Sequence, residues 1–211
     1  MDTAKLQWLR VWGTILLLTG SLDALATPHA LINATRGADT NVFVSQGIEG
    51  EYGTFNRIGA GEDIGSGNEQ IWRGYSFRNS LGLELMKFVQ FSVSHAFVNM
   101  RSKANSLENI RGSRIMGETR LVFSSPIGNV EAGGGVLGSK MEYQMKLLNS
   151  DFLGSGYFYS LGLNYFFSQR VSLYGQGRVF NENLVRNGGS SEIENIKSKT
   201  SNIGLGFSIW L

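Results

Sequence analysis

The chain has 211 residues, a formal net charge of only +2, and no cysteine. A charge this small, carried by scattered basic residues, argues against a nucleic-acid-binding protein. Without cysteine we expect neither a disulfide framework nor a lipid-modified thiol. Past the first residues, no run approaches the roughly 18 apolar residues that a helical membrane span needs. A membrane location would therefore require a closed barrel of strands.

The N-terminal segment, residues 1–26, has the features of a secretory signal peptide. Lys5 and Arg10 make its start basic, a short apolar run follows, and Ala24 and Ala26 form a small-x-small cleavage site. We therefore predict a signal peptide that is cleaved after Ala26.

Residues 27–40 show no clear periodicity and are interpreted as a short periplasmic lead-in, followed by one barrel domain over residues 41–211. Within that domain, large apolar residues recur at every second position, which is the period of a strand with one apolar face. The expected strands span residues 42–55, 71–85, 88–101, 112–124, 130–146, 157–167, 171–182 and 201–211. The expected connections lie at residues 57–69, 86–87, 102–111, 126–129, 147–154, 168–170 and 184–198. They alternate between long and short, as the outer loops and periplasmic turns of an outer-membrane barrel do.

The last expected strand has one apolar face and one face of mostly small residues. The apolar positions, which we expect to face lipid, are Ile203, Leu205, Phe207, Ile209 and Leu211. The opposite positions are Asn202, Gly204, Gly206, Ser208 and Trp210. A secreted soluble barrel of the lipocalin type would place its large apolar side chains inside instead. Small inward residues suit a narrow barrel whose outer face meets lipid.

Aromatic residues near the expected strand ends predict an interfacial girdle. They are Trp72, Tyr75, Phe88, Phe123, Tyr157, Tyr159, Tyr165 and Phe167.

Charged residues occupy many of the positions that the alternation turns inward. They are Glu49, Glu51, Arg78, Glu84, Arg114, Glu118, Arg120, Glu131 and Arg178. Buried charges are tolerable only when they are paired and hydrogen-bonded. Because eight strands leave room for little beyond the side chains, we predict a salt-bridged interior. A narrow gated pore or proton path remains an alternative.

The whole expected mature chain resembles the small OmpA/OmpX-like outer-membrane barrels of Gram-negative bacteria. Its last strand is similar to their carboxyl-terminal signature, which the barrel-assembly machinery reads, with Leu211 where phenylalanine is usual. The resemblance implies an outer-membrane location, contact with lipid and lipopolysaccharide, and recognition by that machinery. No periplasmic peptidoglycan-binding domain is expected after the last strand, so an anchoring role is not implied.

Three glycines, Gly133, Gly135 and Gly138, fit the spacing of a dinucleotide-binding loop. They lie within a strand pattern with no following helix, so we interpret them as making room in a crowded barrel. No cofactor is therefore expected.

His95 is expected to face lipid, which is unusual for a polar ring. One alternative function follows, a lipid-modifying enzyme of the acyl hydrolase or transferase type that would combine His95 with Ser92 or Ser94 and with Glu118. Against it, adjacent strand residues point to opposite faces, and position 97 is Phe rather than the Ser of known deacylases. The other histidine, His29, lies in the lead-in, so no histidine pair supports a metal site.

The sequence thus predicts an all-β protein, an eight-stranded antiparallel up-and-down transmembrane β-barrel. We predict that the protein is not an enzyme and that it serves envelope integrity or surface interaction through its loops. The enzyme, the pore and a role as a component of a larger envelope assembly remain alternatives.

Overall fold

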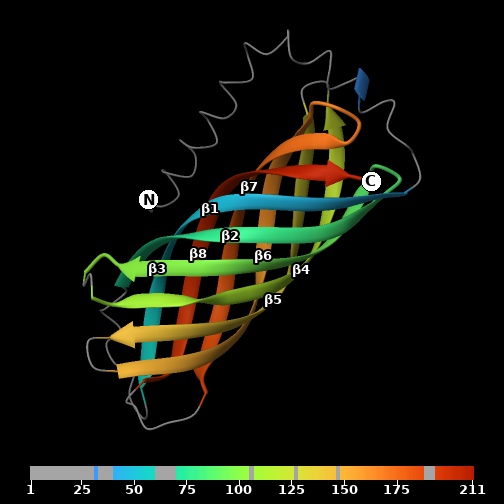
Figure 1. Ribbon diagram of the computed structural model, residues 1–211. Coiled ribbons are helices and arrows are strands. Elements are labelled where there is room, and N and C mark those ends of the chain that lie inside the picture. The colour runs from blue at the N-terminus through green and yellow to red at the C-terminus, as the bar shows by residue number, and fades with distance from the viewer. Residues whose placement is uncertain are drawn as a thin grey trace, which may run out of the picture.

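The computed structural model describes residues 31–32, 40–59, 70–104, 107–125, 128–145, 148–187 and 193–211. Within these residues, eight strands form one sheet that closes on itself, since β1 pairs with both β2 and β8 (Figure 1). Every pairing around the barrel is antiparallel. The strands are β1 (Thr40–Gly59), β2 (Gln70–Leu85), β3 (Val89–Ser102), β4 (Asn109–Ser125), β5 (Gly128–Met145), β6 (Leu148–Phe166), β7 (Val171–Arg186) and β8 (Ile193–Trp210). The predicted fold class is confirmed.

The barrel has two different ends. Short connections join β2 to β3, β4 to β5 and β6 to β7 at one end, which we call the turn end. The other four connections lie at the opposite end, the loop end. The predicted signal peptide, residues 1–26, lies outside the described residues, as does most of the predicted lead-in. Of the lead-in, Ile32 packs against Phe43, Phe166 and Trp210 at the turn end.

The alternation of side chains explains how these segments form a barrel wall. In β3, for example, Phe91 and Phe97 are exposed on the outside, whereas Ser92 and Ser94 are buried inside. The same inside–outside alternation holds along β2 and β4. Among the described residues no helix is long and apolar enough to cross a membrane.

The connection between β2 and β3 is a tight turn of three residues, Met86, Lys87 and Phe88, between the paired residues Leu85 and Val89. Met86 and Lys87 both have positive φ, at 53° and 57°, and the Phe88 amide donates to the Leu85 carbonyl at 3.0 Å. Two consecutive left-handed residues define a type I′ turn, whose twist matches that of the flanking strands. The turn predicted at these two residues is therefore confirmed.

Two predicted long connections are wrong, because the strands continue beyond the apolar stretch. Residues 147–154 were expected as a loop, but β6 begins at Leu148, which pairs with Met145 of β5. Residues 184–198 were also expected as a loop, but they belong largely to the ends of β7 and β8. In both places the backbone ladder continues, while polar outward side chains such as Asp151 and Lys197 interrupt the apolar pattern.

One aromatic residue predicted for the girdle lies inside the barrel. Trp72 is fully buried, with its ring centroid 5.3 Å from that of Phe55 and 5.8 Å from that of Tyr143. Its even position in β2 places it on the same face as Arg78, so strand parity overrides its position near the strand end. The other predicted girdle residues are on the outside, with Tyr165 half-buried and the rest exposed.

Candidate functional site

The lumen holds all the charged side chains that strand alternation predicted to point inward. Each is less than 7% exposed: Glu49, Glu51, Arg78, Glu84, Arg114, Glu118, Arg120, Glu131 and Arg178. They come from β1, β2, β4, β5 and β7, because alternate positions of each strand point to the barrel axis.

Glu49 on β1 lies at the centre of these contacts. Its Oε1 accepts hydrogen bonds from Arg78 Nε and Arg178 Nη1, each at 2.7 Å. Its Oε2 accepts one from Asn202 Nδ2 at 2.5 Å. Two cations and an amide thus satisfy one buried carboxylate, which offsets the cost of removing it from water.

The network continues from Arg178 toward the turn end. Arg178 Nη2 lies 3.2 Å from Glu118 Oε2, and Arg120 Nε lies 3.7 Å from Glu118 Oε1. Arg120 Nη1 in turn donates to Glu131 Oε2 at 2.5 Å. These six side chains, Glu49, Arg78, Glu118, Arg120, Glu131 and Arg178, form a continuous chain that we call the central network.

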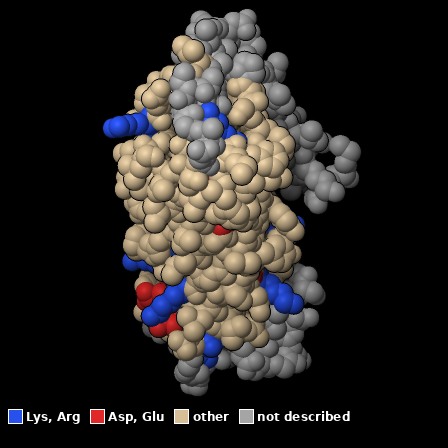
Figure 2. Space-filling view, turned by 90° about the vertical axis from the view of Figure 1, so that its right-hand side faces the viewer, with Lys and Arg blue, Asp and Glu red and all other residues tan. Residues whose placement is uncertain are grey.

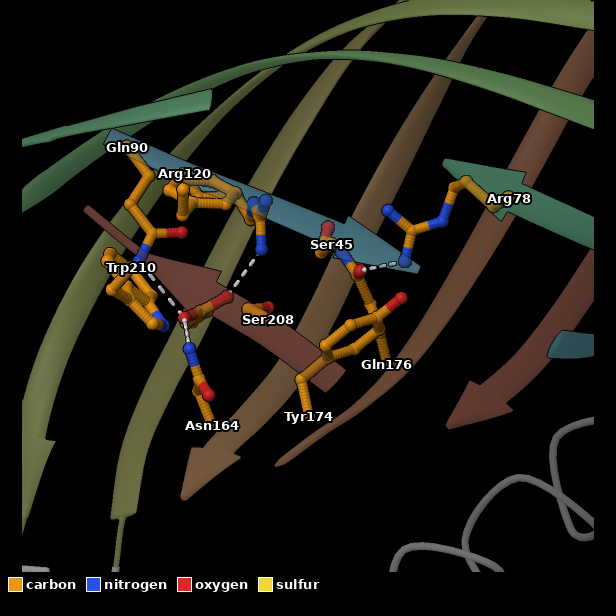
Figure 3. A pocket seen from close by; sticks show the side chains of 11 residues that line it. Ser45, Arg78, Gln90, Arg120, Asn164, Tyr174, Gln176, Ser208 and Trp210 are labelled. Atoms are coloured by element: carbon orange, nitrogen blue, oxygen red, sulfur yellow. Dashed lines mark hydrogen bonds and ion pairs between the residues drawn. The ribbon is translucent and has the colours of Figure 1, made fainter. Parts of the chain in front are cut away.

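Amides extend the central network where ions are absent. Gln90 Nε2 donates to Glu131 Oε1 at 3.1 Å and to Glu84 Oε2 at 2.9 Å. Asn164 Nδ2 donates to Glu131 Oε1 at 3.2 Å, so that carboxylate receives bonds from three directions (Figure 3). Glu84 therefore joins the network through an amide.

A second ionic cluster lies nearer the loop end. Arg114 Nη1 donates to Glu51 Oε2 at 2.8 Å, and Arg114 Nη2 donates to Glu182 Oε2 at 3.1 Å. The guanidinium also lies 4.9 Å from the centre of the Phe180 ring. Sequence analysis missed Glu182, although its even position in β7 shares a face with Arg178 and signals an inward side chain.

Apolar side chains close the lumen on both sides of these ions. Toward the loop end, a cluster that includes Phe55, Trp72, Tyr143 and Phe152 is almost completely buried. At the turn end, the Trp210 ring packs at a tilt against the rings of Phe43 and Phe166. Its Nε1 donates a hydrogen bond to Ser172 Oγ at 2.8 Å. The sequence predicted an inward face of mostly small and polar residues, with Trp210 among its positions. The aromatic layer toward the loop end is an addition to that prediction.

Little space remains between the layers. Figure 3 shows the cavity bordered by Ser45, Arg120, Tyr174, Ser208 and Trp210, among others, and its volume is about 10 Å³. That is room for about one water molecule. Around this cavity the lumen is therefore packed with side chains.

The outer surface has the opposite chemistry. Figure 2 shows a wide zone almost free of charged side chains between two charged ends. Along β2, this zone runs from Tyr75 to Leu85, which are both exposed. About 9–11 residues per tilted strand suffice to cross a bilayer. The zone, which we call the apolar belt, therefore has the height that a membrane requires.

The closing strand completes the belt at the seam. The side chains of Ile203, Leu205, Phe207, Ile209 and Leu211 are all exposed on the outside. Phe207 pairs with Gln46 and Ile209 with Val44 in the register that joins β8 to β1. No free sheet edge remains at this seam.

His95 lies on the outer wall, away from the predicted partners of an enzyme. Its ring packs edge-on against Phe97 at a centroid distance of 4.5 Å. Ser92, Ser94 and Glu118 are buried on the inner side of the wall. The structure therefore does not bring together the serine, histidine and acid that the enzymatic alternative needs. Among the described residues, no group of three or more His, Cys, Asp or Glu side chains could hold a metal ion.

A closed barrel of eight antiparallel strands, apolar outside and side-chain-filled inside, defines the class of small outer-membrane β-barrels. Solved structures with this fold include Neisserial surface protein A, at 14% identity with a TM-score of 0.55, covering 79% of this chain and 96% of that one. They also include the outer membrane protein OprG of Pseudomonas aeruginosa, at 11% identity with a TM-score of 0.52, covering 83% and 98%. No known protein family and no curated protein matches the sequence. At these identities the likeness shows the fold.

Proposed function

We propose that the protein is an integral barrel of the bacterial outer membrane, non-enzymatic, with a closed lumen. It serves envelope integrity or surface interaction through the connections at its loop end. The observation that carries this proposal is the combination of an outer belt almost free of charge with a lumen that side chains fill over the part of the barrel that the structure describes.

The outer belt supports the membrane location. A soluble protein would bury Leu205, Phe207 and Ile209, but each is about half exposed or more on the outer wall. Hydrocarbon is the environment that satisfies such a surface without a partner protein. Closure between β1 and β8 also pairs the backbone groups that lipid could not satisfy.

The orientation follows from the connections. Short turns face the periplasm in barrels of this kind, so the turn end is periplasmic and the loop end is extracellular. The closing strand ends on the periplasmic side, where the assembly machinery would recognise it.

Two measurements test the proposal. Fractionation of cells should recover the protein with the outer membrane, and its electrophoretic mobility should change on heating. In planar bilayers the refolded protein should show no stable open channel, because ions and aromatic layers fill the lumen. Recovery as a soluble periplasmic protein would contradict the location, and a large steady conductance would contradict the closed lumen.

A further inference from the structure

The charged residues on the outer wall are distributed unevenly between the two ends. At the loop end the described outward basic residues form a partial collar, consisting of Arg73, Arg101, Lys103, Arg111, Lys140, Lys197 and Lys199. Only two described acidic residues, Glu142 and Asp151, share that end of the outer wall. In the proposed orientation, the collar lies at the height of the outer-leaflet headgroups.

Part of this collar borders a hollow in the wall. An open depression of about 640 Å³ is lined by Arg111, Lys140, Tyr75, Phe77 and Phe97, among others. Basic side chains thus lie at its upper edge and aromatic rings along one side. That arrangement matches a molecule with an anionic head and an apolar body.

The sheet register explains the hollow. Ser113 is an outward residue of β4 that lies between Phe97 on β3 and Lys140 on β5. Its small side chain leaves a gap between two long neighbours. Arg111 lies two residues away on the same face, so Arg111 and Lys140 are diagonal neighbours, about 7–8 Å apart. Two cations at that spacing can bind one phosphate together, and the serine hydroxyl adds a donor.

The two acidic residues of the hollow lie one outward pair closer to the loop end than Ser113 and Lys140. Glu142 pairs with Arg111 across β4 and β5, and with Asp151 across β5 and β6. Glu142 Oε1 already accepts a hydrogen bond from Gln144 Nε2 at 2.9 Å. Ser113 and Lys140 form the next outward pair, farther from the loop end than Arg111 and Glu142. A phosphate would therefore be held at Ser113 and Lys140, with Arg111 reaching it diagonally.

A second, apolar hollow lies lower on the same strands. It has a volume of about 780 Å³ and is lined by Leu81, Phe91, Val93, Val136 and Gly117, among others. Gly117 belongs to its lining, and no atom lies within 4 Å of the position that a Cβ on Gly117 would take. Gly117 lies roughly 13 Å along β4 from Ser113. This hollow offers room for a hydrocarbon chain below the basic residues.

We propose that this face of β2–β5 binds a phosphorylated glycolipid of the outer leaflet. The phosphate is held by Arg111, Lys140 and Ser113, and an acyl chain lies in the hollow at Gly117. The inference rests on the proposed outer-membrane location and adds a defined binding site on the outer wall to it.

The test uses the full chain refolded in phosphatidylcholine vesicles that contain diphosphoryl lipid A. Insertion is checked first by heat-modifiable mobility. Bound lipid is then counted by native mass spectrometry after extraction in mild detergent, at several lipid concentrations. The variant Arg111→Gln with Lys140→Gln should bind roughly tenfold to thirtyfold more weakly. The control Lys197→Gln with Lys199→Gln removes the same charge from β8, outside the hollow, and should change binding less than about twofold.

Three further arms make the outcome specific. Arg111→Lys with Lys140→Arg keeps the charge and should keep the binding. Gly117→Leu fills the lower hollow and should weaken lipid retention without preventing insertion. Lipid A without its phosphates should bind the unchanged protein as weakly as diphosphoryl lipid A binds the Arg111→Gln, Lys140→Gln variant.

The results separate two kinds of failure. If the chain does not insert, the proposed function and this inference both fail. If it inserts but both double glutamine variants bind alike, or inorganic phosphate competes as well as the lipid does, the lipid site is overturned while the membrane location stands.

Discussion

Arg178 on β7 lies 2.7 Å from Glu49 on β1, although β8 separates the two strands. The residue of β8 that faces Glu49 is Gly204. A Cβ at that position would collide with the Glu49 side chain and would approach the Ile48 carbonyl oxygen to 2.8 Å. The Glu49 side chain can therefore lie over β8, within reach of Arg178, because Gly204 has no side chain.

Replacing Arg178 should destabilise the barrel strongly. Arg178→Met leaves Glu49 and Glu118 buried with fewer positive partners, and breaking a buried pair in this way costs roughly 3–5 kcal/mol. Urea-induced unfolding in lipid vesicles would measure the change. Arg101→Met, which removes an exposed arginine from the outer wall, should change stability by less than about 0.5 kcal/mol. Equal effects of the two variants would show that the central network does not hold the lumen together.

Adding one methyl group at Gly204 should be destabilising, while the same change across the seam is tolerated. Gly204→Ala forces the Glu49 side chain and the β1 backbone to move, which costs roughly 1–3 kcal/mol. Gly50 is the matched control, because it faces outward and its nearest neighbour, the Ile203 carbonyl oxygen, lies at 3.9 Å. Gly50→Ala should be neutral or stabilise by up to about 1 kcal/mol. The same unfolding assay distinguishes them, and a neutral Gly204→Ala would contradict the role given to this glycine.

These contacts mark how far the sequence could predict the structure. Strict alternation placed Glu49, Arg78 and Arg178 inside, because a strand has only two faces and one of them must be apolar to meet lipid. It could not show which ions meet, since that depends on register and on barrel closure. Glu182 was missed for another reason. It was the last residue of the predicted strand, and the inward positions of β7 continue beyond it to Arg186.

The strand ends were harder to predict than the strand centres. In residues 148–154 the outward positions include the polar Asn149 and Asp151, so the apolar signal is weakened even though β6 continues. Ladder hydrogen bonds to β5 hold that part of the strand, and they depend on a partner far along the chain. Trp72 also lies near a strand end. Its aromatic side chain indicated the membrane interface, whereas its even position in β2 places it inside the barrel.

An arginine in the middle of the closing strand should destabilise the inserted barrel. Phe207 is half exposed on the outer wall, and Phe207→Arg would place a charge in hydrocarbon at a cost of roughly 2–4 kcal/mol. Phe207→Leu keeps an apolar side chain and should cost less than about 1.5 kcal/mol. Unfolding in vesicles would measure both variants. If Phe207→Arg were as stable as Phe207→Leu, this face would not contact lipid.

The same substitution one residue earlier should fail for a different reason. The side chain of Gly206→Arg would point into the lumen, where Tyr174 already occupies the space beside the backbone. We expect this variant to refold poorly in detergent as well as in lipid, whereas Phe207→Arg should be affected mainly in lipid. Normal refolding of Gly206→Arg in detergent would indicate that the lumen has more room than the structure shows.

Deleting residues 208–211 should abolish membrane insertion. The deletion removes the pairs Val44–Ile209 and Phe43–Trp210 from the seam, and with them the packing of Trp210 at the turn end. The backbone of β1 would then present unpaired groups to hydrocarbon, each costing several kcal/mol. The deletion also removes the segment that we propose the assembly machinery reads. Cells expressing the truncated chain should contain no heat-modifiable species in the outer membrane.

Two assays on the truncated chain separate the seam from recognition by the machinery. Refolding in detergent without any machinery tests the seam alone, and we expect the truncated chain to fail there too. Leu211→Phe keeps every seam contact and brings the terminus closer to the usual signature, so it should insert at least as well as the unchanged protein. A truncated chain that still reached the outer membrane as a heat-modifiable barrel would show that closure does not depend on these residues.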